Sequence, residues 1–247
     1  MKLLLTSAGI RNPSIRAALL DLLGKPIEDC SALVCSTASY PLQHGPRHAR
    51  DFIAGEEPET PMAELGWKSV GALELTALPS LERDVWLPEV EEADVLLVNG
   101  GDTIYLDRWM RESGLAEVLP SLDLVYVGLS AGSLVMSPSV ADDFAAWTRP
   151  TGGEGLGFVD FVIFPHLDHP DLPENTMADA ERWATGLTDP GYAIDDETAI
   201  KVIDGVRNEP YEVLAVDIED SSQGAVMTAL GSRGGLLQAM HPDGKGR

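Results

Sequence analysis

A serine between two glycines is the first place in this chain where the residue types could do chemistry. The stretch YVGLSAGSLVM (residues 126–136) runs from β-branched and aromatic residues through Gly128, Ser130 and Gly132 into residues that favour a helix. On a sharp turn from strand to helix a serine hydroxyl is exposed, and small neighbours let the helix approach the strands. The N–H of Ala131 would then lie at the helix N-terminus, where it can stabilise an oxyanion. The pattern predicts a nucleophilic serine, with an ordinary tight turn as the alternative.

A second glycine turn follows the clearest apolar run of the chain. In VNGGDT (residues 98–103), Gly100 and Gly101 stand between a predicted strand and a predicted helix. Glycines at such a place let backbone N–H groups approach a bound carbonyl oxygen. We therefore expect Gly100 and Gly101, together with Ala131, to form an oxyanion or substrate-binding site, and a plain strand-to-helix turn is the alternative.

A serine nucleophile also needs a neighbouring base, because its hydroxyl attacks only when another group takes the proton. Three of the five histidines lie in polar or terminal segments, where surface positions are expected: His44, His48 and His241. The other two, His166 and His169, lie in FPHLDHP. His166 directly follows an apolar run, so we expect it at the same carboxyl edge of the sheet as Ser130. We predict that His166 is the general base, with a structural histidine as the alternative.

The third member of such a set is a carboxylate that orients the imidazole and stabilises its charged form. The segment IDDET offers Asp195, Asp196 and Glu197 beside another predicted strand end, and SVADDF offers Asp142 and Asp143. The spacing of the residues does not choose between these two groups.

Other chemistry has fewer residues to support it. His166, Asp168 and His169 could bind a metal, but no clear companion ligand stands elsewhere in the chain, so no metal site is predicted. Cys30 and Cys35 flank the second predicted strand. They are expected to be free thiols, because a disulfide framework or a zinc site would need further partners. We expect no cofactor.

Short apolar runs that alternate with helical patterns must position these residues. Six runs are predicted to be buried strands: 2–6, 31–37, 72–78, 93–101, 122–130 and 158–166. Five stretches are predicted to be helices: 12–24, 46–54, 80–93, 102–115 and 175–187, with Asn12 and Asp102 as N-caps. Strands that are apolar nearly throughout and alternate with helices indicate an α/β fold, with a mostly parallel sheet covered by helices on both faces.

The pattern changes after residue 190. Three runs separated by turn residues are predicted to be strands joined by hairpins: 199–204, 211–218 and 224–230. We interpret them as a C-terminal antiparallel extension of the same domain and not as a second domain, so that residues 1–247 form a single α/β domain. The length of 247 residues is sufficient for one such domain with a substantial core.

The formal net charge of −23 argues against two classes of partner. Nucleic acid and anionic membranes both attract basic patches, so neither is expected to bind. Hydrophobic residues make up 44% and charged residues 23% of the chain, which is typical of a soluble globular protein. No apolar run approaches the length of a membrane span, and the start MKLLLTSAGI is too short for a signal peptide, so a cytoplasmic location is expected.

Four motifs at predicted strand ends resemble those of the peptidase E family of serine peptidases, which includes aspartyl dipeptidases and cyanophycinase. They occur in the family's order: VNGGDTIYL, GLSAGS, FPHLDH and IDDETAI. The resemblance extends from the first predicted strand to about residue 204. It implies a fold related to the class I glutamine amidotransferases, a flavodoxin-like three-layer sandwich. Those enzymes carry a cysteine where this chain has Ser130.

The resemblance also implies roles for individual residues. In the family the acid lies either in the segment that matches IDDET or in the loop after the nucleophile helix. The implied roles are Ser130 as nucleophile, His166 as base, the backbone around Gly100, Gly101 and Ala131 as oxyanion hole, and Asp196 as acid, with Asp143 second.

This chain departs from the family pattern after the histidine motif. The best-known members cleave dipeptides with an N-terminal aspartate, and basic residues in this region are implicated in holding the acidic side chain. In NTMADAERWATGL, Glu181 stands where an arginine would be expected. The adjacent Arg182 would point about 100° away on a helix. Strict specificity for N-terminal aspartate is therefore not implied.

The leading hypothesis is a serine hydrolase that cleaves short peptides through an acyl-enzyme, with a small peptide as its substrate. One alternative is an esterase or amidase in the same frame. If Asp143 were the acid, the order would be serine, acid, histidine, as in α/β-hydrolases. Another alternative is a non-catalytic protein that binds a ligand in the same fold. A homodimer is compatible with the sequence, which does not determine the oligomeric state.

Overall fold

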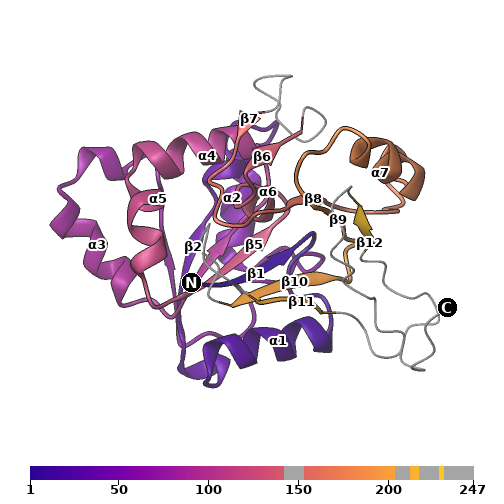
Figure 1. Ribbon diagram of the computed structural model, residues 1–247. Helices are drawn as coiled ribbons and strands as arrows, with labels where there is room; N and C mark the ends of the chain where they lie inside the picture. The colour runs from indigo at the N-terminus through magenta and orange to yellow at the C-terminus, as the bar shows by residue number, and fades with distance from the viewer. Residues whose placement is uncertain (142–152, 204–211, 217–227, 231–247) are drawn as a thin grey trace.

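The computed structural model describes residues 1–141, 153–203, 212–216 and 228–230 (Figure 1). Its main sheet has seven strands in the order β11-β10-β1-β5-β4-β2-β3. Their bounds are β1 Lys2–Thr6, β2 Ser31–Cys35, β3 Ser69–Ala72, β4 Val95–Val98, β5 Val125–Leu129, β10 Ala199–Ile203 and β11 Glu212–Val216. The five strands from β1 to β5 pair in parallel, and β10 and β11 add antiparallel strands at the edge next to β1. The predicted fold class, a mostly parallel sheet with an antiparallel extension, is confirmed.

Helices cover both faces of this sheet (Figure 1). The helix bounds are α1 Pro13–Leu23, α2 Gly45–Ala54, α3 Arg83–Glu91, α4 Thr103–Glu112, α5 Leu115–Val118, α6 Ala131–Leu134 and α7 Met177–Ala184. Short 3-10 helices lie at Ile27–Asp29, Thr37–Ser39, Leu78–Ser80 and Leu119–Ser121. Side chains alternate between the faces of a strand, so Leu4 packs with α1 and α2 while Leu3 and Leu5 pack with α3, α4 and α5. This alternation makes the strands apolar nearly throughout, as the sequence indicated.

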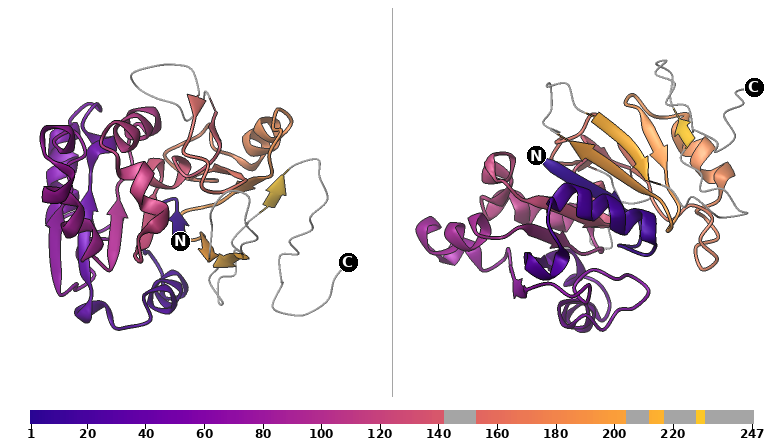
Figure 2. Two further views of the ribbon diagram at one scale, coloured as in Figure 1. Left: turned by 60° about the vertical axis from the view of Figure 1, so that its left-hand side comes forward. Right: turned by 90° about the horizontal axis from the view of Figure 1, so that it is seen from below.

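A second, three-stranded sheet lies at the other end of the molecule from α3, next to α7 (Figures 1 and 2). Its order is β12-β9-β8, with β8 Val162–Phe164, β9 Gly191–Ala193 and β12 Thr228–Leu230. A separate two-stranded pair joins β6 Ser139–Val140 to β7 Gly153–Glu154. Phe161, Ile163 and Tyr192 belong to the same apolar cluster as Leu3 and Tyr126 of the main sheet. The small sheet therefore packs on the core of the large one.

Three strand predictions were wrong in extent or place. Of the predicted run 224–230, the described residues 228–230 form β12, which pairs with β9 of the small sheet instead of forming a hairpin with β11. The run 72–78 is not a strand, because β3 ends at Ala72 and the chain then turns. The carboxylate of Glu74 accepts hydrogen bonds from the backbone N–H and the hydroxyl of Thr76, which closes the turn. The run 158–166 contains only the short strand β8, which pairs with β9 instead of the main sheet.

Local capping and thiol predictions agree with the structure. The side chain of Asn12 accepts the Ile15 N–H at the start of α1, and that of Asp102 accepts the Tyr105 N–H at the start of α4. Cys30 and Cys35 are buried free thiols. Within the described ranges, no helix is both long enough and apolar enough to cross a membrane.

Candidate active site

Ser130 lies on a strained turn between β5 and the short helix α6. Its backbone has φ 47° and ψ −112°, a conformation that non-glycine residues adopt only when the surrounding structure enforces it. Packing explains the two flanking glycines. A Cβ on Gly128 would lie 2.6 Å from the Gly132 backbone, and a Cβ on Gly132 would lie 2.4 Å from the Val98 carbonyl oxygen. The G-x-S-x-G pattern thus lets helix and strands approach one another around the serine.

Hydrogen bonds to the end of β1 hold this turn in place. The Ser130 N–H donates to the Thr6 carbonyl oxygen at 2.9 Å. The Ser133 hydroxyl donates to the same oxygen at 2.8 Å and accepts the Thr6 N–H at 2.9 Å. Thr6 and Ser133 are each 1% exposed, so no water can replace these bonds. Ser133 therefore fastens α6 to β1 directly beside the candidate nucleophile.

We expect Ser133→Ala to lower the free energy of unfolding by about 1–3 kcal/mol, because it leaves the buried Thr6 N–H without an acceptor. Ser137→Ala is the matched control: Ser137 is also 1% exposed, but its hydroxyl has no hydrogen-bond partner among the described residues. Urea unfolding of both variants checks the prediction. Equal loss of stability in the two variants would contradict it.

His166 faces Ser130 from the loop after β8. Its Nε2 lies 3.1 Å from the Ser130 Oγ. The prediction placed His166 at the edge of the main sheet, but β8 belongs to the small sheet, and the loop returns the imidazole to Ser130. The His166 backbone has φ 53°. Its N–H donates at 3.1 Å to the hydroxyl of Ser7, which itself donates to the Ile194 carbonyl oxygen at 3.2 Å. Ser7 thus fixes an otherwise unfavourable backbone conformation.

Asp196 lies on the opposite side of the imidazole. Its Oδ1 is 2.7 Å from the His166 Nδ1. The neighbouring Asp195 has a different partner set, because its Oδ1 accepts the Glu197 N–H at 3.0 Å and the Thr198 hydroxyl at 2.7 Å. The structure therefore brings Asp196, of the three candidates in IDDET, to His166.

The other predicted acids, Asp142 and Asp143, lie outside the described residues. Their position relative to His166 is not described.

Two further basic side chains approach the second oxygen of Asp196. The His169 Nε2 and the Arg11 Nη1 each lie 3.5 Å from Oδ2. The His169 Nδ1 accepts the Asp171 N–H at 3.1 Å, so in the neutral ring the proton is on Nε2 and faces the carboxylate. Burial alone would raise the pKa of Asp196, but the hydrogen bond from His166 and the neighbouring positive charges outweigh burial and lower that pKa. The environment favours an ionised Asp196.

The glycine turn after β4 lies beside Ser130. A Cβ on Gly100 would be 3.2 Å from the Ser130 Cβ, and a Cβ on Gly101, at φ 140°, would be 2.2 Å from the Ala38 carbonyl oxygen. The Gly100 N–H donates to the Asn99 side chain at 2.7 Å. The N–H groups of Gly101 and Ala131 have no acceptor among the described residues. Of the three predicted oxyanion donors, these two are available to a ligand.

The sequence matches the model of peptidase family S51 over residues 3–208. The chain belongs to peptidase family S51. It is therefore a serine-type peptidase, and the peptidase E resemblance of its motifs is confirmed.

Two solved structures share the fold of this S51 chain. A Listeria monocytogenes EGD-e protein provisionally assigned to peptidase E is 18% identical and has a TM-score of 0.59, over 86% of this chain and 97% of its own. A peptidase from an acI-B1 Actinobacterium is 17% identical and has a TM-score of 0.56, over 92% and 96%. At these identities the likeness shows the fold alone.

A curated relative matches a much shorter part of the chain. The large ribosomal subunit assembly factor BipA of Salmonella typhimurium is 58% identical over 45 residues, which is 18% of this chain and 7% of BipA. BipA from Escherichia coli strain K12 matches to the same extent. The chain thus spans a small fraction of these relatives.

The alternative of a metal site at FPHLDH is not supported by the S51 chain's geometry. The Asp168 Oδ1 accepts the Met177 N–H at 3.1 Å, at the start of α7, instead of joining His166 and His169. Among the described residues, no group of three or more His, Cys, Asp or Glu side chains is arranged to hold a metal ion.

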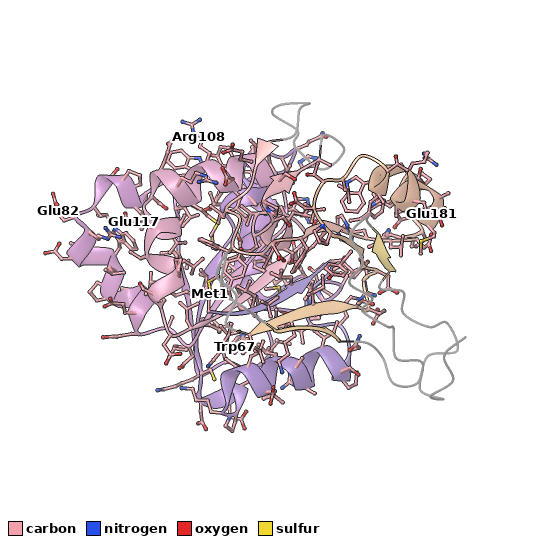
Figure 3. All side chains as sticks on the ribbon, in the orientation of Figure 1. Met1, Trp67, Glu82, Arg108, Glu117 and Glu181 are labelled. Carbon is pink, nitrogen blue, oxygen red and sulfur yellow. The ribbon has the colours of Figure 1, made fainter. Side chains whose placement is uncertain are left out.

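Glu181 and Arg182, the departure from the family pattern, lie on α7. Both residues are exposed, and Figure 3 shows Glu181 on the outer side of the molecule. Arg182 forms an ion pair with Asp179 one turn earlier on the helix. These two α7 side chains therefore do not supply the expected basic group beside Ser130.

The residues that the sequence did not indicate lie at the end of β1 and directly after it. Thr6, Ser7 and Arg11 contact the backbone or side chains of Ser130, His166 and Asp196, as described above. The segment TSAGIRN carries no recognisable catalytic pattern. The available signal was the preceding strand, β1, which lies parallel to β5. The residues that follow two neighbouring parallel strands emerge at the same sheet edge, and Ser130 directly follows β5.

Proposed function

We propose that this S51 peptidase hydrolyses short peptides through a Ser130–His166–Asp196 triad and an acyl-enzyme. One observation carries the proposal: the three side chains form a continuous chain, with 3.1 Å from Ser130 Oγ to His166 Nε2 and 2.7 Å from His166 Nδ1 to Asp196 Oδ1. The strained backbone at Ser130 supports the same assignment. Membership of a peptidase family supports a peptide substrate. The choice of short peptides follows the resemblance of the four motifs to those of peptidase E.

We infer a direction for each proton from the ionised Asp196, which can only accept a hydrogen bond. With its Nδ1–H donated to Asp196, the neutral imidazole of His166 has a lone pair on Nε2 that can accept the Ser130 proton. The Ser130 oxygen then attacks the scissile carbonyl carbon. His166 gives the proton to the leaving amine, and the Asp196 carboxylate stabilises the imidazolium between these steps.

Backbone donors would hold the oxyanion that forms on the carbonyl. We assign this role to the N–H groups of Gly101 and Ala131, because the Gly100 N–H already donates to Asn99. Water then attacks the acyl carbon, with His166 as its base, and releases the acid product.

A panel of dipeptides tests the substrate class. We expect release of amino acids from neutral X-X members within about tenfold of Asp-X members, because one additional charge contact contributes about 1.4 kcal/mol or less when it is partly exposed. The structural reason is that Glu181 and Arg182 of α7 supply no free basic group at the site. Release is measured with wild type, and the Ser130→Ala variant gives the background. Cleavage confined to Asp-X would contradict the specificity, and no Ser130-dependent release from any member would contradict the peptide substrate.

A further inference from the structure

The last residue of β1 and the segment after it together contact all three proposed catalytic residues. The Thr6 carbonyl oxygen accepts the Ser130 N–H at 2.9 Å, and the Ser7 hydroxyl accepts the His166 N–H at 3.1 Å. Arg11 reaches the third residue, with its Nη1 3.5 Å from the Asp196 Oδ2. One short stretch of chain therefore sets the relative positions of nucleophile, base and acid.

Arg11 is the member of this segment that contacts the side chain of Asp196. Its Nε lies 3.0 Å from the Glu197 Oε1 while its Nη1 faces Asp196, so one guanidinium bridges two consecutive carboxylates. The adjacent Asn12 donates to the Glu197 carbonyl oxygen at 2.7 Å and caps α1 through the Ile15 N–H. Asp196 and Glu197 are thereby joined to a rigid helix start.

Orientation of the carboxylate is what this bridge can control. Asp196 has two oxygens, and rotation of its carboxylate would break the 2.7 Å bond between Oδ1 and His166. Arg11 and His169 both face Oδ2, which leaves Oδ1 for His166. A planar guanidinium can contact two carboxylates in fixed directions, whereas an ammonium group is a point charge on a flexible stem.

We propose that Arg11 is a positioning residue of this peptidase, whose guanidinium bridges Asp196 and Glu197 and holds the acid in the orientation that His166 requires. The inference rests on the proposed function, because it gives Arg11 a role in the triad. Arg11 contacts no reacting atom. Its side chain is 34% exposed, so its contribution to folding stability alone is expected to be small.

The positive charge of Arg11 affects the pH dependence of activity, which a purely structural role of its side chain in packing would not do. The ionisable groups facing Asp196 are His166 and His169 from the loop after β8 and Arg11 from the segment after β1, and its chain neighbours are Asp195 and Glu197. Together with the hydrogen bond from His166 and the charges of His166 and His169, and against the effect of burial, the positive charge of Arg11 lowers the pKa of Asp196. Removal of this charge makes protonation easier, so the acidic limb of the activity profile moves to higher pH. The expected shift is about 0.5–1 pH unit.

The experiment compares Arg11→Gln, Arg11→Lys and Arg16→Gln with wild type in the full chain. Arg16 is an exposed residue of α1 and provides the same change of charge away from the site. We expect Arg11→Gln to lower kcat by about 10- to 100-fold with little change in KM, and to move the acidic limb upward. Arg11→Lys should keep the limb in place with an intermediate kcat, and Arg16→Gln should match wild type. Peptide hydrolysis is followed across the acidic limb and up to about pH 9.

An Arg11→Gln variant that folds and keeps both kcat and the acidic limb of wild type would overturn the inference. If that variant does not fold, Arg11→Lys decides, because wild-type kcat in Arg11→Lys would also overturn it. These failures differ from failure of the proposed function, in which wild type itself shows no Ser130-dependent hydrolysis.

Discussion

Replacing Ser130 by alanine is expected to lower kcat/KM for peptide hydrolysis by about 10⁴- to 10⁶-fold, which is the range for loss of a serine nucleophile. The alanine removes the oxygen that lies 3.1 Å from His166 Nε2 but leaves the backbone bond from residue 130 to Thr6. The circular dichroism spectrum should therefore remain that of wild type. Initial rates on the best substrate of the dipeptide panel measure the effect.

Ser137→Ala serves as the control for this substitution, because it also removes a buried serine hydroxyl near α6. It should keep kcat/KM within about twofold, since no contact to the triad is lost. A Ser130→Ala enzyme with more than about a tenth of wild-type activity would show that another group attacks the substrate.

Asp196→Asn is expected to have the second-largest effect, a loss of about 10²- to 10⁴-fold in kcat. An amide at this position can donate a hydrogen bond to the His166 Nδ1, which favours the tautomer whose Nε2 carries a proton and cannot accept one from Ser130. It also removes the negative charge that stabilises the imidazolium. The Asp196 side chain is 14% exposed, so bulk water does not readily compensate for the lost negative charge.

The neighbouring Asp195→Asn is the matched control for the choice of acid. Asp195 accepts the Glu197 N–H and the Thr198 hydroxyl, and an asparagine oxygen can accept both bonds. We expect it to keep kcat within about threefold of wild type. If instead Asp195→Asn or Asp143→Asn abolished activity while Asp196→Asn did not, the assignment of the acid would be wrong.

Local sequence patterns were sufficient to predict the strand-to-helix turn at Ser130. Gly128, Ser130 and Gly132 are close in sequence, and the contacts that require glycine there involve adjacent elements of the same turn and β4. The alternation of apolar strands and helices likewise predicted the parallel sheet, because burial on both faces leaves a continuous apolar signature. The family resemblance added the preference for Asp196 as the acid.

The choice of acid could not be made from residue spacing alone. Asp195, Asp196 and Glu197 are consecutive acidic residues, and their side-chain directions depend on the turn that Asp195 closes with Glu197 and Thr198. The apolar pattern of residues 158–166 also placed the strand before His166 in the main sheet, whereas β8 belongs to the small sheet. The short strand β9, Gly191–Ala193, follows Pro190 and has little strand signal in its sequence. It nevertheless pairs with β8, so that β8 belongs to a separate sheet.

The support supplied by the segment after β1 was not predictable for a different reason. Ser7 contacts His166, and Asn12 contacts Glu197, across 159 and 185 positions of sequence. Such pairs depend on the strand order of the main sheet, which brings β1 between β5 and β10. No pattern within the segment encodes its partners.

The role of Ser130 as nucleophile is tested by mapping the site at which a fluorophosphonate probe forms its covalent adduct. Mass spectrometry of the digested wild-type protein identifies the modified residue. We expect a single adduct on Ser130. It should form more slowly in the Asp196→Asn variant, because His166 then accepts the serine proton poorly. An adduct on a different residue, or hydrolysis of peptides by a protein in which Ser130 stays unmodified under the same probe, would contradict the Ser130–His166–Asp196 mechanism.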